Sequence, residues 1–154
     1  MSARPIAERL FTWPSDAPAL IGSRCGECAA VTFPVNNGCP RCGSASLTDE
    51  ELPRTGTVWA WTTQGFLPKA PYLGADKPDA FQPWVVASVE LPGALRVEAP
   101  LVGITPADVE VGLPVELAIV PLATDADGTE VMSFAFAPAD GAGSLRAGRG
   151  GGSA

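Results

Sequence analysis

The stretch that decides the amino-terminal fold is Cys25-Gly-Glu-Cys28, ten further residues, then Cys39-Pro-Arg-Cys42-Gly43. It holds all four cysteines of the chain as two Cys-x-x-Cys pairs within eighteen residues. A Cys-x-x-Cys turn directs both sulfurs toward one point, and two facing turns form a tetrahedral thiolate set that suits Zn²⁺. Four thiolates leave no open coordination position. We therefore expect one structural zinc ion per chain, bound by Cys25, Cys28, Cys39 and Cys42.

Other interpretations of the four cysteines differ in chemistry. Disulfides need an oxidising compartment, but the start of the chain, Met-Ser-Ala-Arg-Pro, leads into no apolar run, so we expect no signal peptide and a cytoplasmic protein. A thioredoxin-like redox pair needs one motif near a βαβ pattern rather than two facing turns. Iron, as in a rubredoxin-like electron carrier, stays open because tetrahedral sulfur sites accept either metal.

Composition favours a small, mainly β protein. The 154 residues correspond to one medium domain or two small ones, and the 46% hydrophobic content is sufficient for a core. Sixteen prolines and seventeen glycines favour short strands joined by turns over long helices. We expect no membrane span, since no apolar run approaches the roughly 20 residues that one requires.

The charge distribution and the absence of histidine argue against two classes of function. The formal net charge is −7, and residues 55–140 contain three basic side chains against eleven acidic ones. Nucleic-acid binding depends on clustered Lys and Arg, so we expect no nucleic-acid partner. The chain contains no histidine, which removes the commonest general base.

The amino-terminal 54 residues contain two predicted segments. Residues 1–19 are expected to be weakly helical at 6–11 and otherwise irregular. Residues 20–54 are expected to form the rubredoxin-like zinc ribbon and a link. Within them, strands at 20–24 and 31–34 flank the first Cys-x-x-Cys pair, and residues 44–54 are a polar link. Phe33 and Trp13 are expected to pack beside the metal, with an interface role as the alternative.

Residues 55–138 show the element order of a five-stranded OB-fold barrel, with an antiparallel sandwich as the alternative. A short helical turn capped by Thr105 and closed by Gly112 separates the third and fourth strands, and Asp127-Gly128 predicts a hairpin between the last two. Residues 139–154 lack apolar content and are expected to be disordered. The strands are expected at 57–63, 84–91, 95–101, 115–119 and 131–136.

About twenty residues, 64–83, join the first two strands of this barrel. Loops of this length without structure of their own are usually functional or disordered, and the aromatic side chains of this one argue against disorder. It either folds back over the barrel mouth or forms a docking surface for a protein partner or an acyl-CoA. The candidate binding residues are Phe66, Lys69, Tyr72, Phe81 and Trp84.

Several motifs follow one another in order along the chain: Leu20-Ile-Gly-Ser-Arg-Cys25, Phe33-Pro34, Cys39-Pro-Arg-Cys42-Gly43, Gly56-Thr-Val-Trp-Ala-Trp-Thr62, Pro83-Trp-Val-Val-Ala-Ser-Val-Glu-Leu91 and Gly112-Leu-Pro-Val-Glu116. This ordered set resembles the DUF35 family of zinc-ribbon OB-fold proteins over roughly residues 10–138. The double cysteine pair alone is common to many ribbons, whereas the whole set is far more specific. One departure is Ala29, where relatives usually have Gly after the second cysteine, so we expect slight strain there.

This resemblance implies a non-catalytic subunit that pairs with a thiolase-like catalytic subunit, a thiolase or aldolase of the sterol-carrier-protein type. It would stabilise that partner and help to form an acyl-CoA site at or near their interface. The residues are consistent with this role, because no cysteine remains to attack a thioester and no histidine exists to activate a serine. The alternatives are a single-stranded nucleic-acid-binding module, which the charge disfavours, and an iron-loaded electron carrier.

Overall fold

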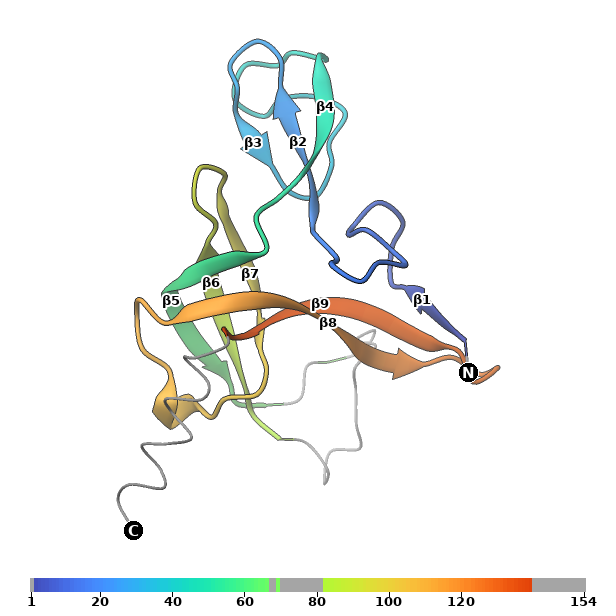
Figure 1. Cartoon of the computed structure of the whole chain (residues 1–154), viewed down its shortest axis with the longest axis vertical. Coiled ribbons are helices and arrows are strands. Elements are labelled where there is room, and N and C mark those ends of the chain that lie inside the picture. The colour runs from blue at the N-terminus through green and yellow to red at the C-terminus, as the bar shows by residue number, and fades with distance from the viewer. Residues whose placement is uncertain (1, 67–68, 70–81, 140–154) are drawn as a thin grey trace.

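The computed structural model describes residues 2–66, 69 and 82–139, and they form a three-stranded sheet beside a β-barrel (Figure 1). The mainly β prediction, with a four-cysteine ribbon before a five-stranded OB-fold, is confirmed. Within these residues no helix is long and apolar enough to cross a membrane. The elements are β1 (Ala3–Pro5), β2 (Ile21–Cys25), β3 (Val31–Thr32), β4 (Leu47–Glu51), β5 (Thr55–Gln64), β6 (Trp84–Glu90), β7 (Arg96–Leu101), the 3-10 turn η2 (Pro106–Asp108), β8 (Pro114–Thr124) and β9 (Glu130–Pro138).

The small sheet has the strand order β3-β2-β4, with both neighbours antiparallel to β2. The interpretation of residues 44–54 as a polar link is wrong, because β4 lies within them. The strand is polar because it forms an edge of a ribbon too small to cover it, and its pairing with β2 outweighs its composition. Gly22 allows the close approach of β2 to β3, since a Cβ there would lie 2.5 Å from the carbonyl oxygen of Thr32.

The predicted weak helix at residues 6–11 is also wrong. This segment forms bends and turns, and Arg9 adopts a left-handed conformation with φ of 59°. A non-glycine residue in that region cannot continue a right-handed helix. The chain instead forms an isolated antiparallel bridge between Phe11 and Leu20, supported by the Thr12 amide donating to the Ala19 carbonyl at 2.9 Å.

The barrel contains the five predicted strands and the predicted helical turn between β7 and β8. The sheet order is β1-β9-β7-β6-β5-β8, and β8 also pairs with β9 to close the barrel. Thr105 is the N-cap residue of η2, as expected, and its hydroxyl donates to the Asp108 carboxylate at 3.0 Å. The β8–β9 hairpin turns at Asp127-Gly128, with Gly128 at φ of 86°. Strand β1, which was not predicted, adds to the outer edge of β9.

Two predictions concern parts of the chain beyond this description. Residues 140–154 of the tail predicted to be disordered at 139–154, and most of the long segment between β5 and β6, lie outside the described residues. Both predictions therefore stay as they were made from the sequence.

The ribbon and the barrel share one hydrophobic core. Alternate residues of β6 and β7 point into the barrel, and Phe11, Leu20 and Leu52 from the amino-terminal part join the same cluster. Phe33 does not rest only against the ribbon, because its ring meets Phe134 of β9 edge to face, with ring centroids 5.5 Å apart. The ribbon is therefore packed onto the barrel rather than tethered to it by a free linker.

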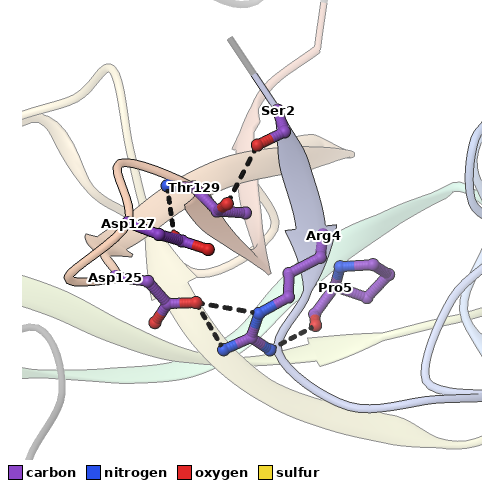
Figure 2. Close-up of polar contacts among 6 residues, drawn as sticks. All are labelled: Ser2, Arg4, Pro5, Asp125, Asp127 and Thr129. Carbon is purple, nitrogen blue, oxygen red and sulfur yellow. Dashed lines mark hydrogen bonds and ion pairs between the residues drawn. The ribbon is translucent and has the colours of Figure 1, made fainter.

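Side-chain contacts fasten β1 to the tip of the β8–β9 hairpin (Figure 2). Strand β1 runs parallel to β9, with Arg4 opposite Val131. The Arg4 guanidinium donates to one carboxylate oxygen of Asp125, with its Nε 3.0 Å away. The hydroxyls of Ser2 and Thr129 lie 2.9 Å apart. These exposed contacts hold the amino terminus along the hairpin.

Candidate metal centre

The two Cys-x-x-Cys turns bring all four sulfurs together at the far end of the ribbon. Their Sγ atoms all lie within 4.8 Å of one another, with Cys25 to Cys42 at 3.6 Å and Cys28 to Cys39 at 3.5 Å. Zn–S bonds of about 2.3 Å in a tetrahedron place the sulfurs about 3.8 Å apart. The four sulfurs therefore fit a tetrahedral metal ion.

Backbone amides prepare the buried sulfurs for a cation. The amides of Cys28 and Glu27 donate to the Sγ of Cys25 at 3.5 and 3.4 Å and lower the pKa of that thiol from 9.0 to about 6. The amides of Cys42 and Arg41 likewise lower the pKa of Cys39. Hydrogen bonds to the charged form favour the thiolate, which is the form that binds metal.

The pKa of Cys42 is shifted in the opposite direction, upward. The Ser44 amide acts to lower its pKa, but the neighbouring thiol of Cys25, burial and the other two sulfurs outweigh that amide and raise the pKa to about 12. Four like-charged sulfurs at these distances cannot all ionise without a cation between them. A divalent metal ion is the group that would resolve this repulsion.

The two turns are built alike, with one difference. Ala29 and Gly43 each follow a second cysteine, and each amide donates back to the carbonyl of the first cysteine, at 3.0 and 2.9 Å. Both adopt left-handed conformations, with φ of 62° for Ala29 and 80° for Gly43. The strain expected at Ala29 thus has a geometric basis, because a Cβ disfavours this conformation.

Arg24 links the first Cys-x-x-Cys turn to β4 by hydrogen bonds. Its guanidinium donates to the Ala29 carbonyl at 3.2 Å and makes a two-point contact with the Glu50 carboxylate of β4, at 2.7 and 2.8 Å. This contact lowers the pKa of Glu50. Arg24 was not among the residues predicted from the sequence, because its partner lies in the segment interpreted as a link.

Three of the five predicted partner and acyl-CoA residues are described, and they lie after the end of β5 or at the start of β6. Phe66 follows β5 and is 73% exposed, Lys69 is exposed, and Trp84 is the half-buried first residue of β6. Tyr72 and Phe81 lie outside the described residues. The role of all five stays a prediction.

A further exposed tryptophan was not predicted as a candidate residue. The β5–β6 register shifts between Val58 and Ala60, so Trp59 sits at a β-bulge and is 49% exposed. The Arg96 guanidinium stacks 3.8 Å from the centre of its ring. The sequence pattern did not single out Trp59, because alternation of apolar and polar residues does not locate a bulge.

Family comparisons match both parts of the chain. Residues 16–48 match the ChsH2 rubredoxin-like zinc ribbon domain, and residues 49–120 match the ChsH2 C-terminal OB-fold domain. The match to the ribbon places the four-cysteine cluster in a metal-binding domain and agrees with the geometry of the sulfurs.

Two proteins and one solved structure are similar to this chain. The chain is 31% identical over 121 residues to a DUF35 domain-containing scaffold protein of Methanocaldococcus jannaschii, covering 77% of this chain and 81% of that protein. It is 37% identical over 101 residues to a probable enoyl-CoA hydratase alpha subunit of Thermomonospora curvata, which covers 64% of this chain but only 28% of that protein. A chain of the solved Ltp2-ChsH2(DUF35) aldolase is similar, with a TM-score of 0.59, 31% identity and coverage of 79% and 85%.

Proposed function

Because the chain belongs to the ChsH2-type DUF35 family, we propose that it is a non-catalytic accessory subunit of a thiolase-like aldolase or thiolase complex. The observation that carries this proposal is the similarity to a chain of the Ltp2-ChsH2(DUF35) aldolase at 31% identity over most of both chains. The subunit stabilises its catalytic partner and helps to form a site for an acyl-CoA.

The chemistry of the chain supports a scaffold role. Its only four thiols gather in one cluster, where a metal ion would have no open position for substrate. With no histidine in the sequence, no imidazole is available as a general base. We therefore infer that the catalytic groups come from the partner subunit.

We further propose that the metal is one zinc ion held by Cys25, Cys28, Cys39 and Cys42. The ion would supply structural cross-linking of the two turns, and the chain's own amides would stabilise the thiolates that receive it. Metal analysis of purified protein should give one zinc per chain and a colourless solution. A red protein with visible absorption would identify iron instead.

The segment after β5, which belongs to the predicted loop at residues 64–83, is proposed to contact the partner and the acyl-CoA. Phe66 is the most exposed of the large hydrophobic side chains described, and Lys69 supplies a cation for a CoA phosphate. Replacing Phe66 or Tyr72 with Ala should weaken association with the partner by about 1–3 kcal/mol if the side chain anchors the interface. Unchanged affinity in both variants would leave this segment without a binding role.

The deciding experiment is co-expression with a thiolase-like protein from the same genome. We expect the two chains to co-elute, and acyl-CoA cleavage to occur with the pair but not with this chain alone. Turnover of a CoA thioester at an enzymatic rate by this purified chain would overturn the proposal.

A second candidate partner is an enoyl-CoA hydratase subunit. The observation that favours it is the 37% identity to part of a probable enoyl-CoA hydratase alpha subunit. Parallel co-expression with a hydratase-type protein of the same genome distinguishes the two candidates, since only the true partner should retain this chain through gel filtration.

A further inference from the structure

The outward face of the β5–β6–β7 sheet is formed by residues that pair across neighbouring strands. Ala60 lies opposite Ser88, and Ser88 lies opposite Glu98. Directly paired residues of antiparallel strands share a face, and the intervening residues Ala87 and Ala99 are buried in the core. These three side chains therefore project outward together.

Small side chains make this face hollow. A shallow depression of about 250 Å³ is lined by residues from all three strands. At the bulge beside it stands Trp59, half-exposed and stacked under the Arg96 guanidinium. An exposed, fixed tryptophan next to a small apolar depression is typical of an interface anchor point. The lining residues are Ala60, Trp61, Thr62, Val86, Ala87, Ser88 and Glu98.

The charges on this face indicate which kind of partner it can bind. Glu98 is exposed and makes no hydrogen bond or ion pair with any residue that the structure describes. Arg96 is already engaged by Trp59 and lies 3.8 Å from the Glu90 carboxylate. Among the described residues, the face thus offers a negative charge without an ion-pair partner beside apolar surface, which attracts a basic side chain and repels the phosphates of a CoA.

A second copy of this chain does not fit these charges. The net charge of −7 and the eleven acidic against three basic residues in 55–140 make two copies repel each other. We propose that this face, centred on Trp59 and Glu98, docks a segment of the catalytic subunit that carries an arginine or lysine beside an apolar side chain. The basic group pairs with Glu98 while the apolar side chain fills the depression. This inference rests on the proposed accessory function and adds a docking surface distinct from the segment after β5.

The test measures the affinity of the purified thiolase-like subunit for variants of the full chain. Glu98→Lys reverses the attracting charge, and Trp59→Ala removes the aromatic anchor. Each should raise the dissociation constant at least about tenfold, since central aromatic and charged contacts dominate interfaces. Glu51→Lys, the same charge reversal at an exposed carboxylate of β4, is the matched control and should leave the affinity unchanged.

Salt dependence gives a second readout. Raising NaCl from about 0.05 to 0.5 M should weaken the wild-type complex, and Glu98→Gln should reduce that dependence because the screened pair is lost. Thermal unfolding and zinc content should match wild type in the Glu98 variants, which shows that lost binding is not lost folding.

The outcomes separate the two proposals. In one outcome the wild-type chain binds its partner, and the dissociation constants of Glu98→Lys and Trp59→Ala both differ from the wild-type value by less than about threefold. That result would overturn the docking surface and leave the accessory function standing. Failure of the wild-type chain to bind any thiolase-like or hydratase partner would overturn both. A wild-type chain that sediments as a dimer, with Trp59→Ala monomeric and partner affinity unchanged, would assign the face to a second copy and also overturn it.

Discussion

At the scale of single residues, the two turns of the metal centre make an internal comparison. Ala29 and Gly43 occupy equivalent positions with left-handed backbones, and that conformation costs a non-glycine residue about 1–2 kcal/mol. We predict that Ala29→Gly raises the free energy of unfolding by up to about 1 kcal/mol, because the relief of strain is partly offset by glycine's greater unfolded-state entropy. Denaturant titration of the metal-loaded protein measures it.

Gly43→Ala is the reciprocal variant. A Cβ at this position would meet no atom within 4 Å, so its cost is conformational and not steric. The free energy of unfolding should fall by about 1–2 kcal/mol. If both substitutions left the stability unchanged, the left-handed conformation at these positions would carry no strain.

The thiol of Cys25 predicts how acid releases the metal. Amide hydrogen bonds lower its pKa from 9.0 to about 6, which favours the thiolate. Its contribution to metal binding is therefore retained above about pH 6 and lost as the pH falls through that value and protons compete for the sulfur. A zinc-sensitive chelator dye should detect release only below about pH 6. In guanidinium chloride, where these amides no longer donate, metal release should begin at higher pH. A midpoint of metal release above about pH 7 in the folded protein would contradict the lowered pKa of Cys25.

At the scale of elements, glycine sets the separation of β5 from β6. A Cβ on Gly56 would collide with the backbone carbonyl oxygen of Glu90. We predict that Gly56→Ala destabilises the barrel by about 1–3 kcal/mol, the range for overpacking a close contact. Gly65→Ala is the control, because a Cβ there meets nothing within 4 Å. Equal unfolding midpoints for the two variants would show that β5 shifts at no cost.

Strands β6 and β7 were predictable because each buries one face, so that core-facing and outward-facing residues alternate. Val85, Ala87 and Val89 of β6 are all buried, as their spacing indicated. Strand β4 was missed because an edge strand of a small ribbon buries little, so its sequence has no reason to alternate. The weak helix at 6–11 was wrong because tertiary pairing between Phe11 and Leu20 outweighed local propensity.

The metal centre was the most predictable part of the site, since the spacing of the cysteines alone brings their sulfurs together. The face around Trp59 was not, because it depends on a bulge and on pairs such as Ala60 with Ser88 that are far apart in sequence. Register across strands is a tertiary property, so no single stretch of the chain encodes that face.

At the scale of the whole molecule, the shared core couples the ribbon to the barrel. Leu20 and Leu52 flank the ribbon and are buried in the same cluster as the barrel strands, and Phe33 contacts Phe134. We predict that removing the metal with a chelator lowers the thermal midpoint of the barrel as well as that of the ribbon, because bound metal stabilises only the folded state.

Amide hydrogen exchange of β5 and β6 with and without chelator measures this coupling, and re-addition of zinc should restore protection. If those strands kept full protection after the metal was removed, the ribbon would be an independent unit despite the shared core. Phe33→Ala should weaken the coupling while leaving the sulfur ligands in place.

The position of β1 along the hairpin has one last consequence. The three residues of β1 pair with one edge of β9 at Glu130–Met132, and the contact between Arg4 and Asp125 holds them there. Trimming the first five residues would uncover unsatisfied amides and carbonyls on a long apolar hairpin, a template onto which a neighbouring molecule can add a strand. We therefore expect the segment at residues 2–5 to protect this edge of β9 from aggregation.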